Sequence, residues 1–544
     1  MRTIKIILFF SVLAISIFLR FYHLDQLPPG LNADEASLGY DAYSLLLTGK
    51  DQYGKAFPIF LRSFGAYQSP LYAYLTTAPI FLFGLSIFAV RLLSALAGIL
   101  TVLMTFIIIY NSKENNKFWQ ALLASFIVSF MPWSIFFSRT AVEANLALFL
   151  VAGAAYFLIR SLRQPVFFIY ASILLAVSTY AYQAQRLSSI LFLLGFTIVF
   201  AKQFLSRKKI VLVGLALMFI IQIPQLTLIN SQAGTRRLDQ VNYFSKNYFD
   251  QNGGNLKSVL FGQQIYIFNQ FSSHYLAYFS PKNLFFDPDP QEGRSIPDLS
   301  VFYGWMFIPL LFGFKVFWEK RKDPTIKILL LFIAVSVIPA ALTREPFYTL
   351  RVLPLFWVLS IIISFGGFEI LCNLRFNILK VILLFIISTF TFVTLYNNYF
   401  ILLKYERSSE YGFPYIELAK KTEELSSKKF VVDLERQSQS YIWFAFFKKY
   451  DPYKLQDQGK DVLKNYYNAA DFNGNKVIGN VEIKDDIWKQ EENSCISDII
   501  VGDLLAVSEA DIKEHELHRE FEIPDLSGKV KLKAYSTRAK GKCY

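Results

Sequence analysis

Apolar runs of about bilayer length recur along the first 400 residues and predict membrane-spanning helices. A helix needs about 20 mostly apolar residues to cross a hydrocarbon layer of ~30 Å. Arg2 and Lys5 precede the first run, but no small-residue cleavage site follows it, so we interpret it as a helix and not as a signal peptide. About eleven crossings are expected, near residues 4–22, 91–110, 119–137, 144–160, 165–181, 187–201, 210–229, 301–318, 327–342, 351–371 and 378–400.

Basic residues between the runs predict which loops face the cytoplasm. If the N-terminus and the loop with Lys113 and Lys117 are both cytoplasmic, only two of the three apolar runs before that loop can cross. The run 71–88 is the exception that we expect, because Pro70 precedes it and Pro79 and Gly84 interrupt it. A broken backbone of this kind is tolerated in an interfacial or re-entrant helix that protein or water covers.

The pattern changes after residue 400, where hydrophobicity falls and charges of both signs appear. The stretches KKFVVDLE and DIIVGDLLAV are strand-like, and SYIWFAFFKKYDP is helix-like. An odd number of crossings places this part outside the cell. We therefore predict an all-α polytopic protein of the plasma membrane, with a cytoplasmic N-terminus, a transmembrane domain (1–400) and an extracytoplasmic α/β domain (401–544).

Composition supports this class. The 544 residues are 54% hydrophobic and 17% aromatic, more apolar material than a soluble core of this size could bury. The net charge of +13 does not indicate nucleic-acid binding, because much of the excess lies in the cytoplasmic loops, where anionic lipid attracts it. Cys372 falls in a cytoplasmic turn, whereas Cys495 and Cys543 could form a disulfide outside the cell or remain free thiols.

Candidate chemistry lies in three outer loops, at 23–90, 138–143 and 230–300, and most of all in the neighbouring carboxylates Asp34 and Glu35. Asn32 can cap a helix that starts at Ala33, with Glu35 reaching back to the cap and Gly49 ending the helix. In one interpretation both carboxylates only favour the positive end of the helix dipole. In the other, the cap holds Asp34 rigidly as an ionised base at the membrane surface, and the two interpretations are compatible.

Further charged side chains stand at the outer ends of predicted crossings. Arg91 follows the interfacial run, Arg139 and Glu143 lie four residues apart in the second outer loop, and Arg351 lies in the segment TREPFYTLR. Each of them fits a functional site, and each also fits a helix-end or lipid-snorkelling role. Aromatic residues near the outer leaflet could line a groove for a lipid tail or form an ordinary interfacial belt.

The order of these features resembles the GT-C class of membrane glycosyltransferases, in the branch of the protein O-mannosyltransferases and the lipid A aminoarabinose transferase. The resemblance covers residues 1 to about 400. It is carried by the acidic pair of the first outer loop and by the stretches SPLYAYLTTAPIFLFGLSIFAVRLLSALAG, SRTAVEANL, STYAYQAQRLS, HYLAYFSPKNLF and IPAALTREPFYTLRVLPLFWVL, in that order.

The resemblance implies an inverting transfer of one sugar from a polyprenyl-phosphate donor in the membrane to a protein, lipid or envelope glycan. Asp34, with Glu35 beside it, matches the family's catalytic acidic position, and Glu143 matches its second acidic position, where aspartate is more usual. Glu143 would orient the acceptor, as would Arg139, or hold Arg139, or bind Mg²⁺ or Mn²⁺ together with Asp34. Arg351 and Arg91 would stabilise the departing phosphate.

One departure argues against aminoarabinose as the sugar. Those transferases carry a lysine before a proline turn, where this chain has Tyr67, Gln68, Ser69 and Pro70.

Two other functions stay open. A transporter or flippase of lipid-linked saccharides would carry ionisable residues near the middle of its spans, and often an internal repeat. Here the charges stand at helix ends, and no repeat is found. A glycan polymerase or ligase would also use outer loops, but it would not be expected to show this order of motifs.

Overall fold

The fold was analysed in a computed structural model of the chain. The structure describes residues 2–537 except 113–115, 205–206, 375–376, 436, 469–471, 473, 486 and 488–497. Lys113, Arg375, Cys495 and Cys543 therefore lie outside the described residues. Two compact units are present, and each is assembled from separate stretches of the chain: unit 1 holds residues 1–22, 68–72 and 91–399, and unit 2 holds residues 23–67, 73–90 and 400–544.

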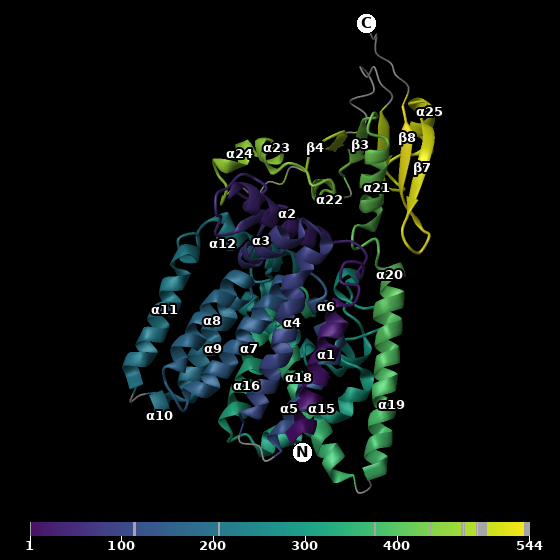
Figure 1. The fold of residues 1–544 in the computed structure, drawn as a ribbon. Helices are drawn as coiled ribbons and strands as arrows, with labels where there is room; N and C mark the ends of the chain where they lie inside the picture. Colours follow the sequence, from purple (N-terminus) through teal and green to yellow (C-terminus); the bar gives the residue numbers. More distant parts are fainter. Residues whose placement is uncertain are drawn as a thin grey trace. The chain divides into compact units, whose positions relative to one another are not determined.

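Unit 1 is a bundle of long helices that run side by side (Figure 1). Its main helices are α1 (Arg2–Phe21), α4 (Ile87–Tyr110), α5 (Lys117–Phe130), α6 (Pro132–Ser138), α7 (Glu143–Ser161), α8 (Phe167–Ala181), α9 (Gln185–Val199), α10 (Ala201–Phe204), α11 (Lys208–Leu226), α15 (Phe307–Glu319), α16 (Pro324–Ser336), α17 (Ile338–Ala341), α18 (Leu353–Asn373) and α19 (Asn377–Leu395). Shorter connecting helices are α12 (Gln232–Val241), α13 (Lys246–Asn252), η2 (Gly254–Ser258), α14 (Gly262–Ala277), η3 (Lys282–Phe286), η4 (Glu292–Arg294), η5 (Gly304–Met306), η6 (Thr349–Val352) and η7 (Tyr396–Leu402).

A helix occupies each of the eleven predicted crossings. Among the described residues, seven helices are long and apolar enough to cross a membrane, or eight if the bent pair α5 and α6 counts as one span. That pair bends by 62° at Pro132. Helices α8 and α9 have 15 residues each and α15 has 13, so these are shorter than the runs that predicted them.

The predicted interfacial helix is α3 (Leu71–Phe83), and it has 13 residues. Such a helix is about 20 Å long. Gly84 follows it with a φ of 71°, and α4 starts at Ile87. The break at Gly84 confirms that the apolar stretch from Leu71 to Tyr110 forms two helices.

Helix α18 forms the centre of unit 1. Its side chains from Leu353 to Gly366 are all buried, and the Trp357 indole donates to the Thr105 hydroxyl of α4 at 2.8 Å. Helix α15 packs closely against it, because a Cβ at Gly366 would lie 1.8 Å from the Pro309 carbonyl oxygen. Small residues allow this close approach between spanning helices.

Helix α19 packs loosely. An apolar cavity of about 450 Å³ separates it from its neighbours, lined by side chains of α5, η5, α15, α18 and α19.

Unit 2 joins the first predicted outer loop to the C-terminal part of the chain. Its helical elements are α2 (Ala33–Thr48), α3, α20 (Leu403–Glu406), α21 (Phe413–Glu424), α22 (Tyr441–Phe447), α23 (Pro452–Asp457), α24 (Lys460–Leu463) and α25 (Glu509–Glu514). Helix α2 packs against α22 and α23. Gly39 of α2 makes this packing possible, since a Cβ there would lie 2.7 Å from the Phe446 ring of α22.

The C-terminal part of unit 2 carries a six-stranded mixed sheet, as the α/β pattern predicted. The strand order is β4-β5-β3-β6-β8-β7, with β3 parallel to β5 and β6 and the other pairs antiparallel. The two strand-like stretches of the sequence are its central strands β3 and β6. Strand bounds are β3 (Phe430–Asp433), β4 (Lys476–Ile478), β5 (Val481–Lys484), β6 (Ile499–Gly502), β7 (His518–Pro524) and β8 (Val530–Ser536), and a separate hairpin joins β1 (Leu61–Ser63) to β2 (Ala66–Gln68).

Candidate functional site

The acidic pair stands in the first turn of α2, and the capping prediction is confirmed. The Glu35 backbone N–H donates to the Asn32 side-chain oxygen at 2.9 Å, and the Asn32 N–H donates to a Glu35 carboxylate oxygen at 3.1 Å. Gly49 ends the helix in the left-handed region, with a φ of 68°.

The two neighbouring carboxylates have different surroundings. Glu35 is 1% exposed and is engaged in the cap, whereas Asp34 is exposed. The N-terminal turn of a helix suits an acidic side chain, and Asp34 lies in that turn of α2. Of the pair, Asp34 is therefore the group that a substrate can reach.

Two further aspartates of unit 2 are completely buried, and the sequence did not point to them. Asp41 accepts from the Gln52 N–H at 3.0 Å and from the Gln52 side-chain amide at 3.1 Å. Asp51 accepts from the N–H groups of Tyr53 (3.0 Å) and Lys55 (2.8 Å) and from the Tyr466 hydroxyl. Within the described part of the chain, neither aspartate pairs with a lysine or an arginine.

Tyrosines extend this polar network from α2 to the C-terminal part of the unit. The Tyr441 hydroxyl donates to the Gln52 side-chain oxygen at 2.8 Å. Burial raises the pKa of the Asp51 carboxyl to about 6. Burial and the nearby Asp51 likewise raise the pKa of Asp41. These groups hold unit 2 together, and their burial keeps them from a substrate.

In unit 1, the predicted site residue Arg139 binds the end of α1. Its side chain is completely buried and donates to the carbonyl oxygens of Leu19 (2.8 Å) and Tyr22 (2.6 Å) and to the Tyr399 hydroxyl (3.1 Å). Carbonyls at a helix C-terminus lack intrahelical donors, so Arg139 satisfies them. This gives Arg139 a structural function, while a role in orienting the acceptor stays a prediction.

The other predicted residues of unit 1 differ in accessibility. Arg91 lies in α4 and is completely buried. Glu143 is the first residue of α7 and is partly exposed. Arg351 lies in η6, just before α18, and is also partly exposed.

Arg351 belongs to a stack of three side chains. Its guanidinium carbon lies 3.9 Å from the Tyr348 ring centroid, and that of Arg294 lies 3.4 Å from the same centroid. Two guanidinium groups this close to one centroid cannot share a face without overlapping, so they lie on opposite faces of the ring. Stacking of this kind is attractive because the faces of an aromatic ring are electronegative.

The two arginines of the stack differ in their counter-charges. Arg294 donates to Asp289 at 3.2 Å and to Glu345 at 3.1 Å, and Asp289 also accepts from the Thr349 hydroxyl at 2.8 Å. Burial opposes the charge of Arg294, but Asp289, Tyr348 and Glu345 together raise its pKa. Arg351 donates to the Thr343 hydroxyl, and no carboxylate among the described residues pairs with it.

Arg351 therefore has no ion-pair partner among the described residues. Tyr182, at the end of α8, connects Arg351 and Glu143: burial raises the pKa of its phenol, and the charges of Tyr348, Arg351 and Glu143 also act on it. On the other side, the Tyr278 hydroxyl accepts from the Tyr348 N–H at 3.1 Å. The structure thus brings Arg351 and Glu143 to one end of the bundle and places Asp34 in the other unit.

Sequence reasoning missed Tyr348, Arg294 and Asp289. Tyr348 stands three residues before Arg351 in the segment TREPFYTLR, and this spacing was a usable signal. Arg294 and Asp289 come from a loop more than 50 residues earlier, and no local pattern indicates their contact with Tyr348. Within the described residues, no group of three or more His, Cys, Asp or Glu is arranged to hold a metal ion, and the Mg²⁺ or Mn²⁺ site stays a prediction.

A bundle of membrane-spanning helices joined to a C-terminal sheet unit is the architecture of the GT-C membrane glycosyltransferases, and the chain has this fold. No protein-family model and no curated protein sequence matches it.

Two kinds of protein are among the similar solved structures. ArnT from Cupriavidus metallidurans, the lipid A aminoarabinose transferase, matches in its apo state with a TM-score of 0.57 and 12% identity over 100% of both chains. Its complex with undecaprenyl phosphate matches with a TM-score of 0.56 and 12% identity over 99% of both chains. The archaeal oligosaccharyltransferase AglB from Archaeoglobus fulgidus, in complex with an inhibitory peptide and a dolichol-phosphate, has a TM-score of 0.50 and 12% identity over 92% of this chain and 69% of that one. At this identity the likeness establishes the fold.

Proposed function

We propose that this protein is an inverting glycosyltransferase that moves a single sugar from a polyprenyl-phosphate donor to an acceptor on the outer face of the membrane. The observation that carries the proposal is Arg351, a partly buried guanidinium at the end of a membrane-spanning bundle with no carboxylate partner among the described residues. A phosphate group is the anion that a lipid-linked sugar would bring to this position. Two solved proteins with this fold bind such lipids, undecaprenyl phosphate in ArnT and a dolichol-phosphate in AglB.

The proposed reaction is a displacement at C1 of the sugar. Asp34 accepts the proton of an acceptor hydroxyl or amine while that oxygen or nitrogen forms a bond to C1. The bond between C1 and the phosphate oxygen breaks, and its electron pair leaves with the polyprenyl phosphate. Attack from the side opposite the phosphate inverts the configuration at C1.

The leaving group determines what Arg351 would contribute. The donor phosphate is a diester with one negative charge, and it leaves as a monoester that gains a second. A cation already in place stabilises this developing charge without reorganisation, which is often worth several kcal/mol in a partly dehydrated site. Tyr348 and Thr343 hold the Arg351 guanidinium in one orientation for this purpose. We propose that Glu143 orients the acceptor.

The prenyl chain of the donor requires an apolar path within the bundle. The cavity of about 450 Å³ beside α19 has a lining that is almost wholly apolar. We propose that this cavity holds the prenyl chain of the donor. The predicted Mg²⁺ or Mn²⁺ ion has no step in this mechanism. Adding a chelator to the assay below tests the metal.

The experiment is the release of polyprenyl phosphate by the purified protein in lipid bilayers. A panel of polyprenyl-phosphate sugars is supplied with a crude acceptor extract, and Asp34→Asn serves as the control. Release that requires both the acceptor and Asp34 supports the proposal and identifies the sugar. Folded protein that releases nothing from any donor would favour a transporter, or a polymerase or ligase of larger lipid-linked glycans.

A further inference from the structure

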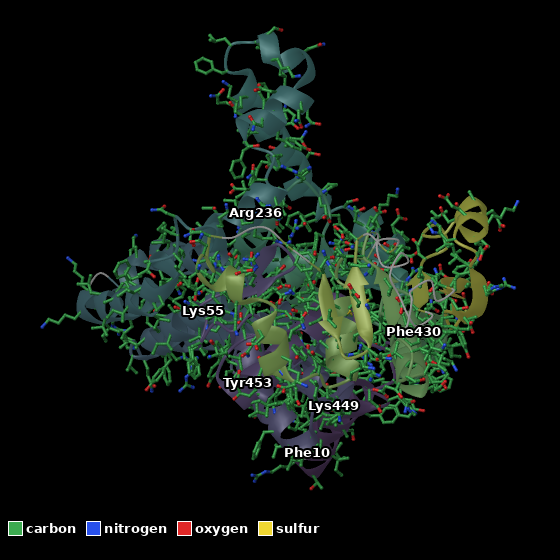
Figure 2. The ribbon with its side chains drawn as sticks, turned by 90° about the horizontal axis from the view of Figure 1, so that it is seen from above. Phe10, Lys55, Arg236, Phe430, Lys449 and Tyr453 are labelled. Atoms are coloured by element: carbon green, nitrogen blue, oxygen red, sulfur yellow. The ribbon has the colours of Figure 1, made fainter. Side chains whose placement is uncertain are left out.

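Residues 246–277 of unit 1 form an arm that contains α13, η2 and α14. Figure 2 shows the segment that follows Arg236 extending beyond the other helices of this unit. The last turn of α14 is held by the spanning helices: a ring nitrogen of His274 lies 2.8 Å from the Thr343 carbonyl oxygen, and the Tyr275 hydroxyl donates to the Ala334 carbonyl at 3.0 Å. Near its start, α14 packs within the arm, where Tyr266 contacts the Phe249 ring at 5.6 Å.

The arm exposes a stripe of large apolar side chains along α14. Phe261 directly precedes α14, and the spacing of Ile265, Phe268 and Leu276 places these three residues on one face of the helix. They are 66%, 40%, 69% and 65% exposed, and at the tip of the arm Leu260 is 80% exposed. Tyr266 and His274, on the opposite face, are buried. The stripe therefore points away from the protein along the length of the helix.

We infer that this arm is a membrane-interface anchor, with the stripe on α14 and the tip of the arm immersed at the boundary between lipid headgroups and acyl chains. Exposing this much apolar surface to water is unfavourable, and large exposed apolar side chains grouped on one face mark an interaction surface. A helix that exposes an apolar face binds in this way at a bilayer interface.

The arm's attachment and its charges identify lipid as the partner. Tyr275, next to Leu276 in the sequence, is hydrogen-bonded to Ala334 within the candidate span Pro324–Ala341. The C-terminal end of the stripe is therefore attached to a helix that is long and apolar enough to cross a membrane. The exposed charged residues of the arm are Lys246, Lys257 and Asp250, and their net positive charge favours contact with lipid phosphates.

The root of the arm also contacts the proposed donor site. Thr343 approaches His274 through its carbonyl oxygen and accepts from Arg351 through its hydroxyl. An anchored arm would then fix the depth of Arg351 at the level where a lipid phosphate lies. This consequence rests on the proposed function, whereas the anchor itself does not.

Fluorescence quenching tests the anchor in the full-length protein. The three native cysteines are replaced by serine, and a bimane label is attached at Phe268→Cys on the stripe, at Leu260→Cys at the tip, or at Gln264→Cys. Gln264 is exposed on α14 outside the stripe and is the matched control. In phosphatidylcholine nanodiscs with brominated acyl chains, we expect several-fold stronger quenching at the first two positions than at the control, and the reverse order with aqueous iodide.

Two results would overturn the anchor. Equal iodide quenching at all three positions would place the stripe in water. Shielding of Phe268→Cys from both quenchers would show that protein covers the stripe, either a second copy or another chain. Both results are independent of activity, so a failure of the anchor is distinguishable from a failure of the proposed transferase.

The kinetic consequence needs a separate variant. Phe268→Asp should raise the KM for the donor while leaving kcat and the KM for the acceptor unchanged, because depth affects only the lipid-linked substrate. An equal loss with both substrates, or no change at all, would remove the connection between the arm and Arg351.

Discussion

Arg351 in unit 1 and Asp51 in unit 2 differ in the exposure of their side chains and in the groups that bind them. Both regions are rich in tyrosine. Arg351 is partly exposed, stacks on Tyr348 and has no carboxylate partner among the described residues. Asp51 is completely buried and is held by backbone N–H groups and the Tyr466 hydroxyl. An accessible charge that the protein leaves unneutralised is available to a ligand, whereas a buried and fully bonded one contributes to the fold.

Asp34 gives the sharpest test of this distinction, because Asp41 on the same helix is a matched control. Asp34→Asn should lower kcat by about 10²- to 10⁴-fold, the usual contribution of a general base, with an unchanged melting temperature. Asp41→Asn should instead shift the melting temperature and leave kcat within a few-fold of the wild type. Both are measured by polyprenyl phosphate release and by thermal unfolding. Wild-type turnover by the Asp34→Asn protein would remove the base assignment.

Removal of the Arg351 guanidinium in unit 1 should have the next largest effect on turnover. Arg351→Ala should raise the donor KM or lower kcat by about ten- to a hundredfold, because a hydrogen bond to a charged group contributes roughly 1.5–3 kcal/mol. Arg321→Ala is the matched control: Arg321 also lies over an aromatic ring, that of Trp318 at 4.9 Å, but in the turn between α15 and α16. A similar loss in both variants would indicate a general effect of removing an arginine and not a phosphate site.

Features that depend on neighbouring residues were predictable from the sequence. The cap at Asn32, the end of α2 at Gly49, the strands β3 and β6 and the positions of the spanning helices all follow from periodicity or from residues within one turn. The physical reason is that helix caps and amphipathic patterns are local interactions.

Features that join distant segments were not predictable. The stack of Arg294 on Tyr348 joins residues 54 positions apart, and the bond from Tyr441 to Gln52 spans 389 positions. Neither contact produces a spacing pattern in the sequence, because the packing of the folded protein determines which residues meet. The same holds for Asp41 and Asp51, whose burial results from the union of the first predicted outer loop with the C-terminal part of the chain in unit 2.

The buried acids predict a pH dependence with a definite sign. The pKa of Asp51 is about 6 in the folded state, above the usual 3.8, so the folded protein binds the proton more tightly than the unfolded chain does. The stabilisation is fully present below the unfolded pKa and is lost as the pH rises through about 6. The melting temperature should therefore increase as the pH falls from 7.5 to 5.5, and Asp51 alone should contribute roughly 1 kcal/mol to this gain in stability.

Asp51→Asn should flatten this dependence without leaving a donor unsatisfied. Its oxygen can still accept from the N–H groups of Tyr53 and Lys55, and its amide can donate to Tyr466, whose hydroxyl then turns to the Phe60 carbonyl at 3.2 Å. Thermal unfolding across the same pH range is the measurement. A variant with the wild-type slope would show that other groups carry the titration.

The smallest predicted effect tests whether the cap of α2 holds Asp34 in position or only stabilises the helix. Asn32→Ala removes the cap and should cost about 1 kcal/mol. It should also lower kcat a few-fold, with an unchanged donor KM, because the turn that carries Asp34 loses its fixed position. Ser508→Ala is the matched control, since Ser508 and Asp511 form the same capping box on α25 of the same unit. If kcat responds only to the Asn32 cap, the cap acts by holding Asp34 in place; equal kcat values in the two variants would mean that it only stabilises the helix.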